Sequence, residues 1–109
     1  MKLEELTYDA TGLIPAVIQD ETSKAVLMVG YMNNESLSLT LQTNKVHFYS
    51  RSREELWLKG QSSGNFLIVK EVFADCDGDA LLVVVSPAGP VCHTGRVSCF
   101  DNHERLEIS

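Results

Sequence analysis

The hydrophobic residues of this chain gather in short runs between polar turns, a pattern that predicts strands more often than helices. Each run is short enough for a buried or half-buried strand, and the run at 80–86 is rich in β-branched residues. Segments rich in Gly, Ser and Pro separate several of the runs. The pattern predicts strands at residues 14–19, 25–32, 46–50, 66–74 and 80–86.

The segment 35–42 has the spacing of a helix instead. Two of its leucines lie four residues apart, Asn33 or Asn34 offers an N-cap before it, and Asn44 would end it. Residues 53–58 fit either one helical turn or an extended segment, and the pattern does not decide between them. We expect a strand-dominated α+β fold with one main helix and a small mixed or antiparallel sheet, or a pseudo-barrel.

Length and charge narrow the class of protein. A chain of 109 residues has room for one domain, 1–109. The net charge of −6 argues against a nucleic-acid partner held by bulk electrostatics. The acidic N-terminus does not resemble a signal peptide, and no apolar run approaches the roughly 20 residues that span a bilayer. We expect a cytoplasmic protein with no membrane and no nucleic-acid partner.

The cysteines Cys76, Cys92 and Cys99 are the first candidates for chemistry. Three cysteines cannot all pair within the chain, and a reducing compartment favours metal binding or catalysis over a disulfide. Their spacings of fifteen and six residues are not those of a C-x₂-C knuckle. Three thiolates suit zinc and leave a fourth position open, which His93 fills only if the backbone turns there. The alternative is that all three are ordinary buried side chains.

An acidic motif surrounds the first cysteine. Asp75, Asp77 and Asp79 alternate with other residues, so an extended backbone would place their carboxylates on one side. Close carboxylates repel one another unless a cation or protons intervene, and such oxygen ligands suit Mg²⁺. The motif is not an EF-hand loop, because Ala80 stands where that loop needs glycine. The alternative is a solvated acidic turn between two strands.

Cationic residues gather in the middle of the chain, where Lys45, Arg51, Arg53 and Lys59 lie within fifteen positions. Arg51 and Arg53 would point the same way in a strand, and the arginine fork matches phosphate. The loop 60–64 offers backbone N–H groups to an anion. The alternative is a solvated strand face that two neighbouring glutamates partly balance.

Taken together, these segments resemble the phosphoribosyl-AMP cyclohydrolase family. The resemblance covers most of the chain, from about residue 13 to residue 100, and several ordered motifs of this length are hard to obtain by chance. It rests on residues 13–17, 31–33, 49–53 and 56–60, and most specifically on 75–82, 92–95 and 98–100.

The resemblance implies two metals and two subunits. Members of the family are homodimers in which thiolates of both subunits hold one zinc ion. By resemblance, Cys76 would come from one chain, and Cys92 with Cys99 from the other. The family's magnesium-binding aspartates match Asp75, Asp77 and Asp79.

The reaction that the resemblance implies is the zinc-dependent hydrolytic opening of the adenine ring of 1-(5-phosphoribosyl)-AMP between N1 and C6. Its product is the formimino-carboxamide ribonucleotide of histidine biosynthesis. His93 is the candidate for proton transfer, and Arg51, Arg53 and Lys59 are the candidates for binding the two phosphate groups. The family's loop usually has glutamate where this chain has Gln61, which removes a charge. Many relatives carry a fused pyrophosphohydrolase domain, which we expect this chain to lack.

Two other interpretations stay open at this point. A structural zinc module would have a fourth protein ligand and would lose its fold without the metal. A thiol redox protein would join Cys92 and Cys99 under mild oxidation, and zinc would be irrelevant to it.

Overall fold

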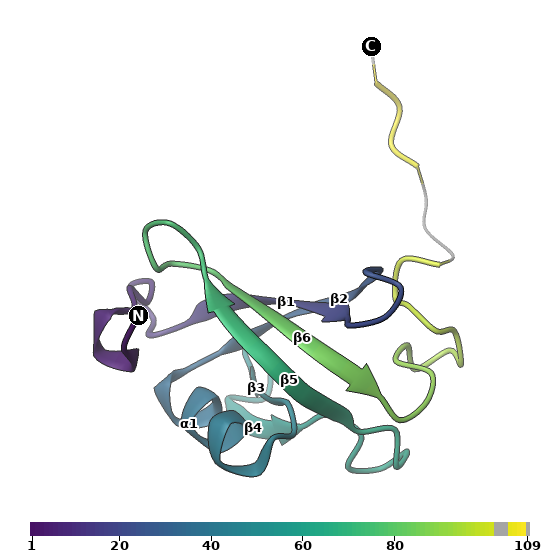
Figure 1. Cartoon of the computed structure of the whole chain (residues 1–109), viewed down its shortest axis with the longest axis horizontal. Helices are drawn as coiled ribbons and strands as arrows, with labels where there is room; N and C mark the ends of the chain where they lie inside the picture. The colour runs from purple at the N-terminus through teal and green to yellow at the C-terminus, as the bar shows by residue number, and fades with distance from the viewer. Residues whose placement is uncertain (102–104, 109) are drawn as a thin grey trace.

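A four-stranded sheet forms the centre of the molecule, and a helix and a two-stranded hairpin cover one of its faces (Figure 1). The computed structural model describes residues 1–101 and 105–108. Its elements, in chain order, are the short 3-10 helix η1 (Leu3–Glu5), strands β1 (Ile14–Asp20) and β2 (Val26–Met32), helix α1 (Asn34–Thr43), and strands β3 (His47–Ser50), β4 (Glu55–Leu58), β5 (Leu67–Ala74) and β6 (Leu81–Pro87).

The main sheet has the strand order β2-β1-β6-β5. β1 pairs antiparallel with β2 and parallel with β6, and β5 pairs antiparallel with β6. The parallel pair needs a long crossover, which here contains β2, α1, the β3–β4 hairpin and β5. The expected strand-rich α+β fold with a mixed sheet is confirmed. The sheet stays open at β2 and β5 in the described part of the chain, so the pseudo-barrel alternative is wrong.

The core lies between this sheet and the elements that cover it. Alternate residues of β1 point into the core, and Ile14, Ala16 and Ile18 are fully buried there. Leu37 of α1 and Phe48 of β3 belong to the same hydrophobic cluster. The periodicity of two in β1 therefore serves this core, whereas only Leu37 of the two α1 leucines reaches it, because Leu41 is 42% exposed.

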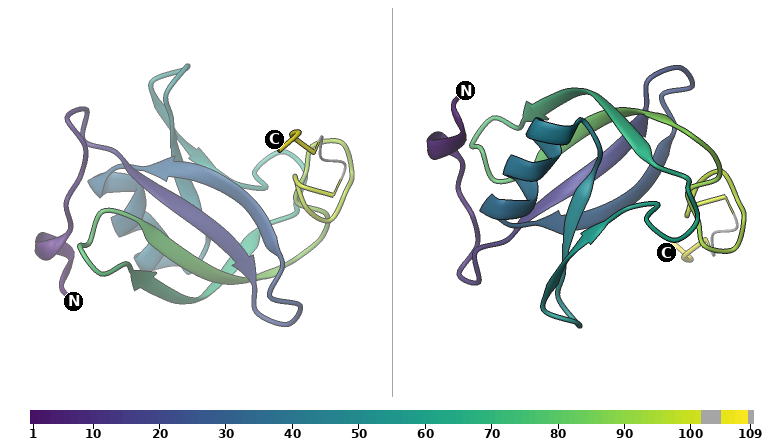
Figure 2. Two further views of the ribbon diagram at one scale, coloured as in Figure 1. Left: turned by 90° about the horizontal axis from the view of Figure 1, so that it is seen from above. Right: turned by 90° about the horizontal axis from the view of Figure 1, so that it is seen from below.

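The opposite face of the sheet is turned toward the viewer in Figure 2 (left), with α1 and the hairpin behind it. The register of the strands aligns an apolar row of Val29, Val17, Leu82 and Phe73 across β2, β1, β6 and β5. Val29 and Phe73 are each 48% exposed. Contiguous exposed apolar side chains of this kind are typical of a surface that another chain covers.

Helix α1 begins and ends where the asparagines predict. The Asn33 side chain accepts a hydrogen bond from the Ser36 N–H at 2.8 Å, and the Ser36 hydroxyl accepts one from the Asn33 N–H at 2.9 Å. This reciprocal pair is a capping box. Asn44 ends the helix in the left-handed conformation, with φ of 59°.

Residues 53–58, which the pattern left undecided, are mainly extended. β4 pairs antiparallel with β3, and Trp57 lies opposite Phe48. Glu54 takes φ of 52° in the turn that joins the two strands. The hairpin packs against β2 at Gly30, where an added Cβ would lie 2.6 Å from ring carbons of Phe48. A glycine at this position lets the Phe48 ring approach the sheet.

The predicted strands are confirmed, with ends that shift by one residue. In the part of the chain that the structure describes, we find no helix with the length and apolar character needed to cross a membrane.

Candidate active site and metal centres

The segment after β6 turns back on itself and brings Cys92 and Cys99 to one end of the sheet. The Cys92 N–H donates to the Arg96 carbonyl at 3.1 Å, and Gly95 turns the chain with φ of 89°. The Cys99 N–H donates to the Leu27 carbonyl of β2 at 2.8 Å. This last bond fixes the second thiol beside the sheet.

The two thiols interact, and their pKa values move in opposite directions. The Thr94 hydroxyl oxygen lies 3.1 Å from the Cys92 sulfur and is the main cause of the lowered pKa of Cys92. The Thr94 N–H, the Cys99 thiol and the charge of Lys59 lower this pKa further, against the effect of burial. Burial and the neighbouring Cys92 raise the pKa of Cys99. Cys92 is therefore the first of the pair to become a thiolate, the form that binds metals.

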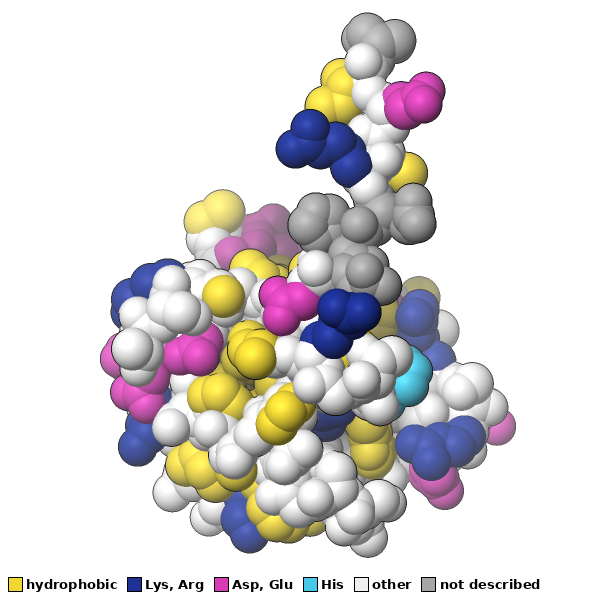
Figure 3. Space-filling view, turned by 90° about the vertical axis from the view of Figure 1, so that its right-hand side faces the viewer, with side chains coloured by type: hydrophobic (Ala, Val, Ile, Leu, Met, Phe, Trp, Pro, Cys, Tyr) yellow, Lys and Arg dark blue, Asp and Glu magenta, His cyan; other side chains and the backbone are white. Residues whose placement is uncertain are grey.

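A cleft of about 360 Å³ opens beside this thiol pair, between the end of β4, the loop that follows β4 and the C-terminal loop. Cys92, His93 and Lys59 all line it, so the structure brings three predicted site residues together. Gln61 and Trp57 line it as well. Figure 3 views this side of the molecule, where a histidine and basic side chains lie beside apolar ones.

His93 lies in a backbone turn, which is the condition for it to act as a fourth zinc ligand beside Cys92. Its ring, however, does not form a compact set of three with the sulfurs of Cys92 and Cys99. Among the described residues, the one group of three His, Cys, Asp or Glu side chains with ligand atoms within 4.8 Å of one another is formed by aspartates. Within one chain the sulfur site therefore consists of two thiols, with His93 in the adjoining cleft.

Cys76 lies apart from the other two cysteines. It sits in the turn between β5 and β6, whereas Cys92 and Cys99 follow the other end of β6. A strand of seven residues is about 20 Å long. One chain alone therefore cannot bring the three sulfurs to one metal ion.

The acidic motif around Cys76 forms a turn between β5 and β6, as the alternative interpretation predicts, and is not an extended segment. Asp75 accepts hydrogen bonds from the N–H groups of Asp79 at 2.9 Å and Ala80 at 3.2 Å. Gly78 takes φ of 72° within this turn. The carboxylates of Asp75, Asp77 and Asp79 still converge, because the turn brings their oxygens within 4.8 Å of one another.

The pKa values of these aspartates reflect hydrogen bonds within the cluster. Side-chain hydrogen bonds with Asp77 and then Asp75 raise the pKa of Asp79 to about 6, and burial and the two neighbouring charges act in the same direction. Burial alone would raise the pKa of Asp75, but hydrogen bonds from Asp79 and from the N–H groups of Asp79 and Ala80 outweigh it and lower this pKa. Such a set of crowded carboxylates has the chemistry of a divalent-cation site, although an exposed acidic turn can exist without one.

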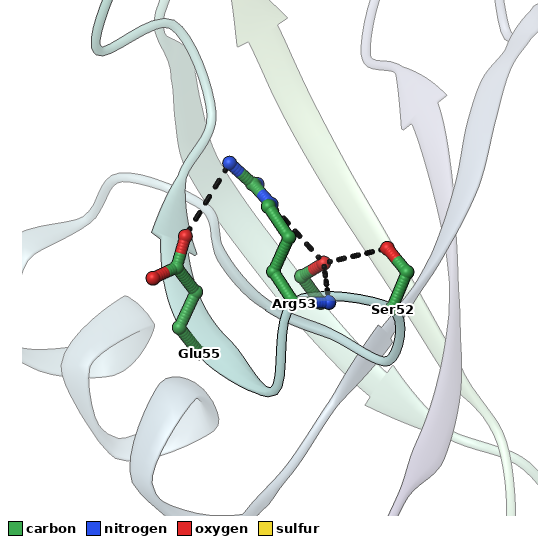
Figure 4. Close-up of polar contacts among 4 residues, drawn as sticks. Ser52, Arg53 and Glu55 are labelled. Atoms are coloured by element: carbon green, nitrogen blue, oxygen red, sulfur yellow. Dashed lines mark hydrogen bonds and ion pairs between the residues drawn. The ribbon is translucent and has the colours of Figure 1, made fainter.

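The arginines line a second depression, of about 340 Å³, between β2 and the β3–β4 hairpin. The Arg51 guanidinium lies over the Tyr31 ring at 4.1 Å. Arg53 forms an ion pair with Glu55 at 3.4 Å, and its Nε donates to the Ser50 hydroxyl at 3.4 Å (Figure 4). The structure therefore separates the two arginines from Lys59, which lies in the first cleft.

Comparison with known proteins identifies the family. A family model described as phosphoribosyl-AMP cyclohydrolase matches residues 28–101, the part that contains every candidate site residue. The chain is a member of the phosphoribosyl-AMP cyclohydrolase family. This confirms the family that the sequence motifs resemble.

Members of this family match most of the chain. The phosphoribosyl-AMP cyclohydrolase of Clostridium botulinum (strain Okra / Type B1) is 61% identical over 89 residues, which are 82% of this chain and 81% of the relative. That of Lacticaseibacillus paracasei is 58% identical over 94 residues, 86% of each chain. The histidine biosynthesis bifunctional protein HisIE of Bacillus subtilis is 54% identical over 104 residues, 95% of this chain and 50% of the relative. The chain thus spans about half the length of the bifunctional relatives that it matches.

Two residues at the site escaped the sequence reasoning. Thr94 hydrogen-bonds to Cys92, and its position two residues after a cysteine in a Gly-containing turn was the available signal. Trp57 is half-buried and packs on the core while it lines both depressions. The sequence signal for Trp57 was the presence of two cationic residues nearby, Lys59 two positions after it and Arg53 four positions before it.

Proposed function

We propose that this protein catalyses the zinc-dependent hydrolytic opening of the adenine ring of 1-(5-phosphoribosyl)-AMP between N1 and C6, in histidine biosynthesis. The product would be the formimino-carboxamide ribonucleotide. The observation that carries the proposal is the cleft in which Cys92, paired with Cys99, lies with His93 and Lys59 in a chain of this family. Thiols, an imidazole and a cation in one cleft suit hydrolysis of an anionic nucleotide.

Cys92 and Cys99 of one subunit and Cys76 of a second subunit would hold the zinc ion. The thiol pair fits this role, because its sulfurs interact and the pKa of Cys92 is lowered by the Thr94 hydroxyl. Zinc bound by three protein ligands supplies a water of lowered pKa as the nucleophile.

His93 would transfer protons during the reaction. Substitution on N1 makes the adenine ring electron-poor, which makes C6 the atom open to attack by water. N1 then leaves and needs a proton. Histidine exchanges protons near neutral pH, and His93 lines the cleft beside Cys92.

The phosphate groups of the substrate need positive charge. Lys59 in the first cleft and Arg51 and Arg53 in the second depression would provide it. Mg²⁺ on Asp75, Asp77 and Asp79 would neutralise the crowded carboxylates next to Cys76.

The proposal requires a homodimer. The position of Cys76 at the opposite end of β6 from Cys92 and Cys99 supports it, because a second copy that runs antiparallel to the first would bring the two ends together. The apolar row of Val29 and Phe73 supports it further, since a second copy would cover exposed apolar area. In this arrangement the acidic turn of each subunit lies at the cleft of the other.

The test follows purine ring opening by its absorbance change, before and after chelation, together with metal analysis. We expect about one zinc per chain, loss of turnover on chelation and recovery when zinc returns. Circular dichroism of the chelated protein separates the proposal from a structural zinc module, which would unfold. Full activity in metal-free protein would refute the proposal. A Cys92–Cys99 disulfide that forms reversibly in a protein without ring-opening activity would favour a thiol redox function instead.

A further inference from the structure

Two depressions of the molecule share one wall, the side chain of Trp57. The cleft with Cys92 and His93 lies on one side of it, and the depression with Arg51 lies on the other. Trp57 is held in place because its ring packs against the buried Phe48, with ring centroids 5.5 Å apart. A fixed aromatic wall between two adjoining hollows gives one ligand a continuous apolar surface along which to lie.

Cationic side chains line both depressions next to this wall. The Lys59 ammonium lies 5.4 Å from the Trp57 ring centroid, and the Arg53 guanidinium lies 5.9 Å from it. Arg51 follows on the far side, in the second depression. A ligand with an apolar ring in its middle and an anionic group at each end would match this distribution of charge.

The two arginines are not equally available to an anion. Arg53 already engages the Glu55 carboxylate and the Ser50 hydroxyl (Figure 4), so a new anion would compete with these partners. Arg51 instead stacks on the Tyr31 ring, 4.1 Å away. Stacking uses a face of the guanidinium and leaves its N–H groups, which lie in the plane, to donate to an anion.

Asp9 is a carboxylate whose pKa is affected by the charge of Arg51. Hydrogen bonds from the Thr11 hydroxyl and the Leu13 N–H are the main causes of the lowered pKa of Asp9, and Arg51 contributes least. Asp9 already accepts hydrogen bonds from Thr11 and Leu13. Asp9 is therefore a weak competitor for Arg51.

We propose that Arg51 binds one of the two phosphate groups of the substrate, while the purine ring lies across the Trp57 wall in the cleft that holds Cys92 and His93. This inference rests on the proposed function and adds to it the residue that anchors one end of the substrate. Trp57 acts as a positioning residue, and the other phosphate lies on the Lys59 side. Arg53 can support the same phosphate only after it gives up its ion pair with Glu55, so Arg51 is the primary anchor.

The test is the kinetics of ring opening by the zinc-loaded wild-type protein and by Arg51→Gln. We expect KM to rise about ten-fold or more, and kcat to change by less than about two-fold, because a charge-assisted hydrogen bond to a remote phosphate is lost. Arg51→Lys keeps the charge without the fork and should give an intermediate KM. Lys70→Gln, which removes the same charge from an exposed position in β5 outside both depressions, is the matched control and should leave KM unchanged.

A second readout does not depend on turnover. The chain has one tryptophan, so its fluorescence reports on Trp57 alone. We expect inorganic phosphate to change this fluorescence in the wild type, and about ten-fold more phosphate to be needed in Arg51→Gln.

The outcomes separate the two proposals. Wild-type protein that opens the ring, with an unchanged KM in Arg51→Gln, would overturn the Arg51 subsite and leave the proposed function intact. Wild-type protein without ring-opening activity would refute the proposed function. In that case the phosphate titration decides whether Arg51 forms an anion site, and equal titrations of wild type and Arg51→Gln would end that claim too.

Discussion

Asp79 shows how crowding changes the chemistry of a single residue. The neighbouring carboxylates of Asp77 and Asp75 raise its pKa to about 6. A bound cation would favour the deprotonated form, so we expect Mg²⁺ affinity to fall as the pH drops below about 6, where a proton must leave first. Calorimetric titration with Mg²⁺ at about pH 5 and about pH 7.5 measures this effect. Equal affinity at the two values would contradict a cation site at this turn.

The raised pKa of Asp79 also predicts how the stability of the cation-free protein changes with pH. The native state holds the Asp79 proton more tightly than the unfolded chain, whose aspartate has a pKa of 3.8. The stability from this proton is present at low pH and is lost as the pH rises through about 6. The melting temperature of the wild type relative to Asp79→Asn should therefore fall across this range, and Mg²⁺ should abolish the trend.

Gly30 has a steric role that the sequence does not reveal. An added Cβ would lie 2.6 Å from carbons of the buried Phe48 ring, which is itself fixed against Trp57. We expect Gly30→Ala to destabilise the protein by about 1–3 kcal/mol, because a packed ring must move. Urea unfolding measures the loss. Val26→Ala, at an exposed position of the same strand outside the apolar row, is the control, and an equally small effect of both changes would contradict the close approach.

At the scale of the element, helix α1 depends on Asn33, the N-cap residue that precedes it. The Asn33 side chain satisfies the Ser36 N–H, which has no partner within the helix. We expect Asn33→Ala to lower the free energy of unfolding by about 1 kcal/mol. Asn34→Ala makes the same change one residue later, at an exposed position, and should have a much smaller effect in the same denaturation experiment. Similar losses for the two variants would argue against the capping box.

The elements were largely predictable because local signals agree with the fold. β-branched runs define the strands of the main sheet, and asparagine caps define α1. Residues 53–58 were not predictable, because their local pattern is ambiguous and pairing with β3 makes them a strand. The parallel pairing of β1 with β6 is equally a tertiary choice that no local pattern encodes.

The candidate site was predictable in its residues but not in its arrangement. The motifs point to the cysteines, the aspartates and His93. Six residues between Cys92 and Cys99 do not reveal the Gly95 turn that brings the two thiols together. Nor does a fifteen-residue spacing reveal that β6 holds Cys76 at the far end of the sheet. Distances of this kind depend on strand direction, which only the complete fold sets.

At the scale of the whole molecule, the two ends of β6 carry complementary chemistry. One end holds Cys76 and the acidic turn, and the other holds Cys92 and Cys99 with the cationic cleft. In a two-fold dimer each site would take one end from each chain, so every dimer would have two identical composite sites. Within the described part of a single chain, the three cysteines do not come together at one point.

Complementation between two inactive variants tests this arrangement most directly. Cys76→Ala and Cys92→Ala should each abolish ring opening, because each removes a ligand from both sites of its own homodimer. After equal amounts are mixed and the subunits exchange, half of the dimers are mixed and contain one intact site, so activity should return to about a quarter of the wild-type value. A mixture that stays inactive although mass spectrometry detects the mixed dimer would contradict a site built from two chains.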